Sequence, residues 1–200
     1  MVKPSLIVIA GCNGSGKSSF SNALTPQKIT PFDYDKHFLS KYKPLQDSDI
    51  RSEIAHNLTF KLLEESINKA ISTNTDFCYE TNFNSTPLHW PDIFKKAGFE
   101  LNLIYFCLDS IEQAKKRVSI RVENGGHHVP DYEVESRFKL GYMNLDKYYM
   151  KFDNIHLLNS SFYNEEPKHI VTLSKKRIVN TNEFPDFLKH LLPNIYKHIK

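Results

Sequence analysis

A glycine-rich segment near the N-terminus carries the residue types that bind a row of phosphates. The letters GCNGSGKSS match the pattern G-x-x-x-x-G-K-[ST] in full and follow the apolar run LIVIA. Glycines let backbone amides turn toward an anion at a helix start, the lysine reaches the β- and γ-phosphates, and the serine hydroxyl is a ligand for Mg²⁺. The pattern predicts an ATP and Mg²⁺ site made by Gly11, Asn13, Gly14, Ser15, Gly16, Lys17, Ser18 and Ser19.

Acidic residues at two later places could act on an acceptor hydroxyl or on the metal ion. In FDYDKHF, Asp35 could take the proton of an incoming hydroxyl, with Asp33 beside it as a substrate contact. Glu80 ends the apolar run of DFCYET, at the edge where α/β sheets bind ligands, so we expect it to contact Mg²⁺ or the acceptor. Thr81 and Asn82 offer that ligand neutral hydrogen bonds. A solvated turn at the aspartates and a loop-capping carboxylate at Glu80 are the alternatives.

Three arginines flank a glycine-rich corner and could surround the phosphates. Arg117 and Arg121 are four residues apart and share a helical face, and Arg137 follows the corner ENGGHHVP on the next helix. We predict a helical lid over about residues 117–140 that closes on the nucleotide and excludes water. Arg117 would contact ATP, while Arg121 and Arg137 would join Lys17 in neutralising the transferring phosphoryl group. A surface helix with ordinary charge spacing is the alternative.

Other polar residues fit a site less well. Asp109 ends the run LIYFCLD, but a helix follows directly at Ser110, so we interpret Asp109 as a turn or cap residue. His127 and His128 have no third ligand at metal spacing, which favours a loop-stabilising role over zinc. Cys12 lies at a helix start, where a lowered thiol pKa is expected.

Strand and helix patterns alternate along the chain. Short apolar runs predict buried strands at SLIVIAG, DFCYET, ELNLIYFCLD and NIHLLN, and a second strand is expected to end near the first aspartates. A hairpin is predicted in HIVTLSKKRIV, and a C-terminal helix interrupted by Pro193. The order indicates an α/β fold of the P-loop NTPase type, a parallel sheet with helices on both faces, in one domain over 1–200. The expected apolar stripe of the helix at 52–71 is Ile54, Leu58, Leu62, Ile67 and Ile71.

Composition narrows the partners and the compartment. A net charge of +3 and a pI of about 8.6 are too weakly basic to indicate a nucleic-acid partner. Cys12, Cys78 and Cys107 form no CxxC pair, which is typical of a reducing compartment. The apolar run before Gly11 is too short for a signal segment or a membrane span, so we expect a cytoplasmic protein without a membrane partner.

A set of short segments resembles a known family. GCNGSGKS is followed by DYD, by YETN, and by RVENGGHHVPDYEVESRF with NLDKYY behind it. Over about residues 5–161 this combination resembles the zeta toxin family of P-loop kinases, and its most specific part is the GGH-x-VP corner after an arginine helix. Two positions depart from the family pattern, because Cys12 replaces a proline and Asp33 replaces an asparagine.

The resemblance implies ATP-dependent phosphoryl transfer to a sugar hydroxyl, with UDP-N-acetylglucosamine as the acceptor and an antitoxin protein as a possible partner. It implies that Asp35 is the general base, that Glu80 and Thr81 contact the acceptor, and that Arg121 and Arg137 contact phosphates. Since the sequence also lacks the guanine-reading N-K-x-D, we predict a small-molecule kinase whose acceptor is a nucleotide sugar. A nucleoside or other metabolite kinase, and a nucleotide-binding ATPase or regulator without transfer activity, are the alternatives.

Overall fold

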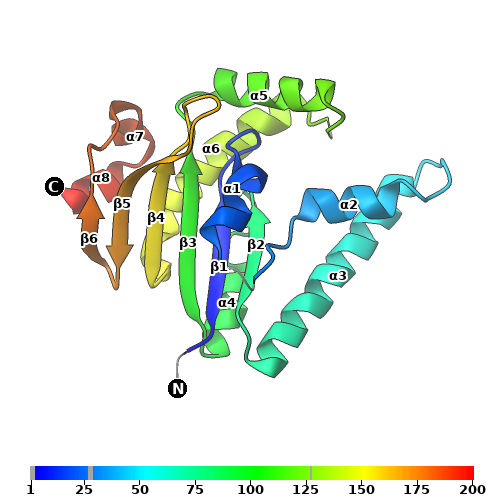
Figure 1. Ribbon diagram of the computed structural model, residues 1–200, viewed down its shortest axis with the longest axis horizontal. Coiled ribbons are helices and arrows are strands. Elements are labelled where there is room, and N and C mark those ends of the chain that lie inside the picture. The colour runs from blue at the N-terminus through cyan, green and yellow to red at the C-terminus, as the bar shows by residue number, and fades with distance from the viewer. Residues whose placement is uncertain (1–2, 27–28, 127) are drawn as a thin grey trace.

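A mixed sheet forms the centre of the protein (Figure 1). The structure is a computed structural model that describes residues 3–26, 29–126 and 128–200. Within these residues the sheet has six strands in the order β2-β1-β3-β4-β5-β6. Leu6, Val8 and Ile9 in the first strand are fully buried, as expected for a strand covered on both faces. The strands are β1 (Ser5–Ala10), β2 (Phe77–Thr81), β3 (Glu100–Cys107), β4 (Asn154–Asn159), β5 (Lys168–Ser174) and β6 (Arg177–Thr181).

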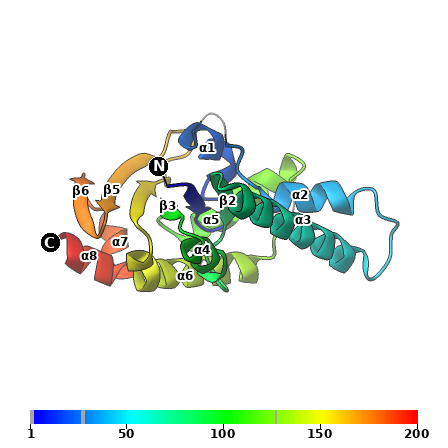
Figure 2. The ribbon, with the colours of Figure 1, turned by 90° about the horizontal axis from the view of Figure 1, so that it is seen from below.

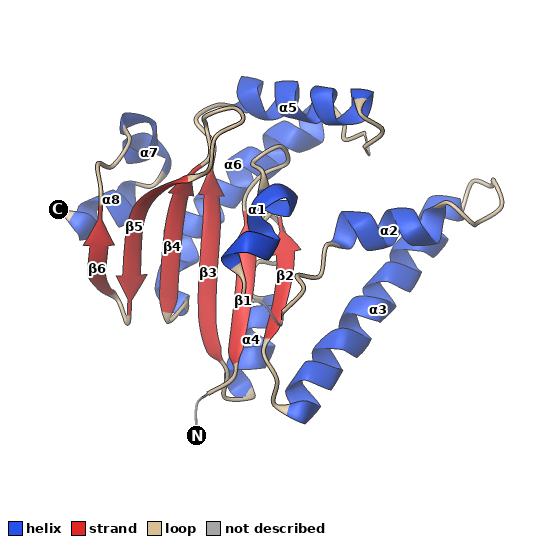
Figure 3. Ribbon diagram, in the orientation of Figure 1, coloured by secondary structure: helices blue, strands red, loops and turns tan. Residues whose placement is uncertain are grey.

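Helices lie on both faces of the sheet, which confirms the predicted α/β fold (Figures 2 and 3). Phe20 of α1 packs with Ile9 and Phe106 on one face, and α4 and α6 cover the other. The C-terminal pair α7 and α8 lies beside α6, and Pro193 begins α8, as predicted. The helices are α1 (Lys17–Leu24), α2 (Tyr34–Tyr42), α3 (Arg51–Thr73), α4 (His89–Lys96), α5 (Ile111–Glu123), α6 (Asp131–Tyr148), α7 (Asp186–Leu191) and α8 (Pro193–Ile199), with a 3₁₀ turn at Tyr149–Lys151.

The last two strands differ from the predicted parallel sheet. β1 pairs in parallel with β2 and β3, and β3 with β4, whereas β4–β5 and β5–β6 are antiparallel. A parallel strand needs a crossover of about a dozen residues or more, and the loop between β4 and β5 is too short for one. Lys175 and Lys176 form the β5–β6 turn with left-handed φ values of 48° and 66°, so the predicted hairpin is present.

The helices α2 and α3 project beyond the β2 edge of the sheet (Figure 1). The buried face of α3 is formed by Ala55, Thr59, Leu63, Ile67 and Ala70. The predicted stripe was wrong in its first half, because Ile54 and Leu58 are 37% and 43% exposed. Ala55 and Thr59 are fully buried, and the Thr59 hydroxyl donates a hydrogen bond to the Ala55 carbonyl at 2.7 Å.

The prediction of a strand that ends near Asp33 and Asp35 was also wrong. Phe32 forms only an isolated bridge with Tyr79, and Asp33 then caps α2 by accepting a hydrogen bond from the Lys36 amide at 3.0 Å. A capping carboxylate favours an early helix start, which leaves no room for a longer strand. Within the described residues no helix is both long and apolar enough to cross a membrane.

Candidate active site

Gly14 lies where the loop between β1 and α1 touches α5. Its φ is 77°, and a Cβ there would lie 2.8 Å from the Ala114 carbonyl oxygen. At Gly11, where φ is 145°, a Cβ would lie 2.7 Å from the Phe106 carbonyl oxygen. Only glycine fits both positions, since other residues would meet backbone that cannot move away. The spacing of the P-loop glycines is therefore explained by packing as well as by phosphate access.

The N-terminus of α1 has the features of an anion site. Its N-cap, Gly16, offers no side-chain cap to the first helical amides. Ser15 Oγ beside it is buried without a hydrogen-bond partner among the described residues. Uncapped amides and an unpaired buried hydroxyl are polar groups that a phosphate chain satisfies. The observed loop thus fits the phosphates of ATP.

Lys17 is held at the centre of this loop by three oxygen atoms. Its ammonium donates hydrogen bonds to the carbonyls of Gly11 at 2.7 Å and Cys12 at 3.0 Å, and to Asn82 Oδ1 at 3.2 Å. Burial lowers the Lys17 pKa, and the nearby carboxylates of Glu80 and Asp35 oppose that shift. The contact with Asn82 joins the P-loop to the end of β2.

Ser18 and Glu80 meet as a metal site of the Mg²⁺ type requires. The Ser18 hydroxyl donates a hydrogen bond to Glu80 Oε2 at 2.7 Å. Burial raises the Glu80 pKa, while the hydrogen bond from Ser18 and the charge of Lys17 lower it. Among the described residues no group of three or more His, Cys, Asp or Glu could hold a metal alone. The pair fits Mg²⁺, which uses few protein oxygens and completes its shell with water and phosphate.

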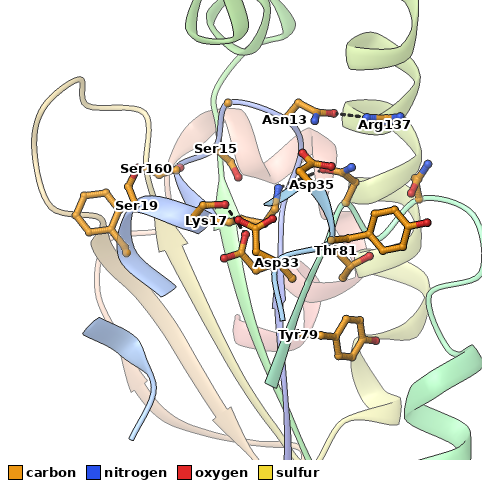
Figure 4. Close-up of a pocket in the computed structure, with 18 of the residues that line it drawn as sticks. Asn13, Ser15, Lys17, Ser19, Asp33, Asp35, Tyr79, Thr81, Arg137 and Ser160 are labelled. Carbon is orange, nitrogen blue, oxygen red and sulfur yellow. Dashed lines mark hydrogen bonds between the residues drawn. The ribbon is translucent and has the colours of Figure 1, made fainter. Parts of the chain in front are cut away.

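Asp35 lies in the first turn of α2 and faces the helix that carries two of the predicted arginines. Its Oδ2 is 3.9 Å from Nη1 of Arg121 on α5. Both side chains are partly exposed, at 51% and 38%. Figure 4 places Asp35 between Lys17 and the Asn13–Arg137 pair. A partly exposed carboxylate next to a guanidinium and an ammonium is accessible to a hydroxyl that approaches the end of a phosphate chain.

Arg137 is tied directly to the P-loop. Its Nη1 donates to Asn13 Oδ1 at 3.1 Å, and its Nη2 pairs with Glu133 one turn earlier on α6 (Figure 4). Val134 and Phe138, the neighbours of Arg137 on α6, are buried in the core. The α6 half of the predicted lid is therefore anchored, and the closing motion remains a prediction for the residues before it.

Arg117 holds the opposite end of the loop. Its guanidinium donates to the carbonyls of Gly14 at 3.4 Å, Ser160 at 2.8 Å and Ser161 at 2.9 Å. It lies 5.9 Å from the centre of the Tyr163 ring. Burial lowers the Arg117 pKa. Arg117 thus braces the P-loop against the segment after β4, and its predicted contact with the nucleotide remains a prediction.

The segment after β2 is positioned by α6. Thr81 Oγ accepts the Phe83 amide at 3.0 Å, and Asn144 Nδ2 donates to the carbonyls of Phe83 at 3.0 Å and Asn84 at 2.5 Å. Gly141 permits the close approach, since a Cβ there would lie 2.9 Å from the Asn82 carbonyl oxygen. Thr81 and Asn82, two of the residues predicted to bind an acceptor, therefore adjoin a segment that is held against a core helix.

One cavity of about 900 Å³ crosses the carboxyl ends of β2, β1 and β4 and joins these groups. Ligands of α/β sheets bind at this edge. Gly11 is absent from the lining, and it contributes through its close packing on Phe106 and through its carbonyl, which accepts a hydrogen bond from Lys17. The lining contains all the other predicted site residues: Asn13, Gly14, Ser15, Gly16, Lys17, Ser18, Ser19, Asp33, Asp35, Glu80, Thr81, Asn82, Arg117, Arg121 and Arg137.

The sequence did not predict several lining residues. His56, Phe60 and Trp90 lie on helices far from the P-loop in the chain. The segments Asn84–Pro87 and Phe162–Glu165 also line the cavity. Scattered aromatic residues carry no spacing signal, so only the fold reveals that they meet.

The remaining sequence expectations have different outcomes. The prediction of a lowered Cys12 pKa was wrong, because burial of the thiol raises its pKa to about 11. Asp109 is outside the cavity lining and accepts the Ser110 hydroxyl at 3.0 Å, as expected of a turn residue. His128 is exposed, and His127 lies outside the described residues.

Comparison with known proteins decides the family. A profile of the zeta toxin family matches residues 2–161. The chain belongs to the zeta toxin family. No curated protein matches this zeta toxin family member in sequence. Family membership and the P-loop geometry together support ATP binding and a kinase or nucleotide-binding function.

Solved structures share the fold of this family member at low identity. A structure from the PezAT chromosomal toxin–antitoxin system of Streptococcus pneumoniae matches with a TM-score of 0.62 and 15% identity, over 100% of this chain and 87% of that chain. AvrRxo1-ORF1:-ORF2 with ATP matches with a TM-score of 0.69 and 14% identity, over 98% and 63% of the two chains. The Pnkp1/Rnl/Hen1 RNA repair complex matches with a TM-score of 0.57 and 22% identity, over 74% and 47%.

Proposed function

We propose that the protein is an ATP-dependent phosphotransferase that moves the γ-phosphoryl group to a hydroxyl of a small molecule. The observation that carries this proposal is the 3.9 Å approach of Asp35 to Arg121 in the cavity that also contains Lys17 and the Ser18–Glu80 pair. A protein that only binds nucleotide needs the loop, but it does not need a carboxylate beside it. A carboxylate base next to cations is the set that phosphoryl transfer to a hydroxyl requires.

Each side chain has a separate task in this proposal. ATP and Mg²⁺ supply the phosphoryl group and a divalent charge, with Ser18 and Glu80 as the protein groups nearest the metal. Asp35 orients the acceptor hydroxyl and takes its proton as the acceptor oxygen bonds to the γ-phosphorus and ADP leaves. Lys17, Arg121 and Arg137 neutralise charge on the transferring oxygens, where fixed cations lower the barrier most.

Family membership supports a first choice of acceptor and of protein partner. The zeta toxin likeness makes a nucleotide sugar of the UDP-N-acetylglucosamine type the first acceptor to test, with Asp33, Thr81 and Asn82 as further contacts. A nucleoside or another metabolite is the second. An antitoxin that covers the nucleotide cavity is the proposed protein partner, since one structural relative comes from a toxin–antitoxin system.

The test is a transfer assay with γ-labelled ATP, Mg²⁺ and a panel of hydroxyl compounds. We expect label in a phosphorylated product whose mass is increased by one phosphoryl group. Asp35→Asn should remove that product, while Asp47→Asn should not, because Asp47 pairs with Arg51 outside the cavity. ADP release that no acceptor accelerates, and that Asp35→Asn leaves unchanged, would instead identify an ATPase or a nucleotide-gated regulator.

A further inference from the structure

The cavity has two chemically different ends. Lys17, Arg117, Arg121 and Arg137 are the lysines and arginines among its described lining residues. All of them lie on the P-loop or on α5 and α6. The positive charge of the cavity is therefore confined to the side that surrounds the P-loop.

The opposite side, formed by α2, α3, β2 and α4, contributes five aromatic residues beside the carboxylates of Asp35 and Glu80. We name it the aromatic wall, and it consists of Tyr34, His56, Phe60, Tyr79 and Trp90. Neutral groups at Asn84–Pro87 border it, and no lysine or arginine lies in the described part of this wall or its border. A ligand phosphate placed here would find no lysine or arginine to replace its water.

Two rings of the aromatic wall are available to a ligand. Phe60 is 44% exposed although it belongs to a long packed helix. Its ring lies 6.0 Å from that of Trp90 at an interplanar angle of 40°. The Trp90 ring also contacts the ring of its neighbour His89 edge-on, with ring centres 4.4 Å apart. An exposed phenyl ring beside a half-buried indole ring, both in the cavity lining, is suited to stacking on a planar ligand ring.

The other members of the wall are already fixed by contacts. His56 Nδ1 is 3.3 Å from the Tyr34 hydroxyl, and the His56 ring stacks on Phe38 with centres 4.3 Å apart. Tyr79 is nearly buried and lies at the end of the cavity away from Arg137 (Figure 4). The wall is therefore a formed surface, which a ligand can use without ordering it first.

The position of the Ser18–Glu80 pair indicates which of the two substrates, ATP or the acceptor, would contact the aromatic wall. Ser18 and Glu80 would hold Mg²⁺, which would neutralise the phosphates of ATP, and Glu80 belongs to β2, so the terminal phosphate would lie on the β2 side of the P-loop. The base of ATP would then lie at the other end, where Arg117 and Tyr163 adjoin the segment after β4. The aromatic wall is left for the acceptor.

We propose that the acceptor is an uncharged hydroxyl compound with a planar heterocycle, of the nucleoside class, whose ring stacks on Phe60 and Trp90. The inference rests on the proposed phosphotransferase function and narrows its acceptor. The base of a nucleotide sugar fits the wall, whereas its diphosphate finds no cation there. The sugar hydroxyl of a nucleoside held on the wall can face Asp35, which lies between the wall and Arg121.

The chain has a single tryptophan, so its fluorescence reports directly on this wall. Nucleosides, their 5′-monophosphates and free ribose are titrated into the full chain with Mg²⁺ and saturating ADP, which fills the donor end. We expect at least one nucleoside to quench Trp90 fluorescence saturably and to bind about tenfold or more tightly than its monophosphate. Ribose and ADP alone should produce no comparable quench.

Phe60→Leu keeps an apolar side chain and removes the ring, so nucleoside affinity should fall roughly three- to tenfold. Leu58→Ala is the matched control, since Leu58 is equally exposed on α3 but does not line the cavity. Equal or tighter binding of the monophosphates, a quench by ADP alone, no quench by any nucleoside, or no effect of Phe60→Leu would each overturn the inference.

Labelled ATP separates this inference from the function on which it rests. A nucleoside that quenches Trp90 but receives no label would contradict the kinase and leave the ligand class in place. Label transfer to a nucleotide sugar but to no nucleoside would support the kinase and overturn the uncharged acceptor.

Discussion

The guanidinium of Arg121 on α5 lies 3.9 Å from the carboxylate of Asp35 on α2, across the cavity that contains the P-loop. The two helices belong to different parts of the fold, since α2 packs on α3 and α5 packs on α6. The pair therefore connects the projecting α2–α3 unit with the helix that carries the cations. The proposed chemistry takes place at this junction.

Arg121→Ala should lower turnover by about a hundredfold or more and change ATP affinity much less, because charge builds on the γ-oxygens mainly in the transition state. Arg121→Lys should recover part of the rate. The measurement is kcat against the ATP dissociation constant. Lys115→Ala is the control, since Lys115 lies on the same helix and pairs with Asp131 and Glu135 outside the cavity. A loss confined to ATP affinity would contradict a transition-state role.

Lys17→Ala should abolish transfer and weaken triphosphate binding, because it removes the half-buried ammonium at the centre of the P-loop. Calorimetric titration with ATP and with AMP provides the measurement. The triphosphate should lose more affinity than AMP, which lacks the phosphates that Lys17 reaches. Unchanged turnover in a folded variant would show that the loop is not the nucleotide site.

As the pH is lowered, activity should begin to fall at a higher pH than it would if Glu80 had the pKa of an ordinary glutamate. Burial raises the Glu80 pKa, so this carboxylate takes up a proton at a higher pH than a solvated one. Because the ionised form attracts Mg²⁺, the Mg²⁺ concentration needed for half-maximal rate should increase as the pH falls through that raised pKa. Rate measurements across pH and Mg²⁺ test this, and Glu80→Gln should make the Mg²⁺ requirement high and nearly independent of pH. If the Mg²⁺ requirement of Glu80→Gln still increased as the pH falls, the pH dependence would belong to another group.

Gly141→Ala should destabilise the fold by roughly 1–3 kcal/mol and disturb the segment after β2. The new Cβ would lie 2.7 Å from the Tyr105 hydroxyl and 2.9 Å from the Asn82 carbonyl oxygen. The Tyr105 hydroxyl is buried and has no hydrogen-bond partner among the described residues, so Tyr105→Phe should be nearly neutral alone and should partly restore Gly141→Ala. Urea unfolding of the three variants measures this. Additive effects of the two substitutions would contradict the contact.

The local parts of the site were predictable from the sequence, and the long-range parts were not. The P-loop is one continuous segment, so its glycines, Lys17 and Ser18 carry their own signal. The apolar stripe of α3 was misplaced because Ala55 and Thr59 form the packed face while Ile54 and Leu58 stay exposed. Periodicity locates a helix, but it does not decide which of two apolar faces a neighbour covers.

Contacts between distant helices explain the other differences. Phe60 and Trp90 meet only because α3 and α4 flank the same strand edge. The raised Cys12 pKa follows from burial under neighbouring segments, which outweighs the position at a helix start.

The central claim is that the terminal phosphate goes to an organic hydroxyl under the control of Asp35. Its most direct test is the mass of the product formed from ATP and the best-binding acceptor, with wild-type protein, Asp35→Asn and Asp47→Asn in parallel. We predict a phosphorylated acceptor in equal amount to ADP for wild type and Asp47→Asn. For Asp35→Asn we predict a rate lower by roughly a hundredfold or more with ATP affinity retained. ADP formed without a phosphorylated acceptor, at the same rate in all three proteins, would contradict the account.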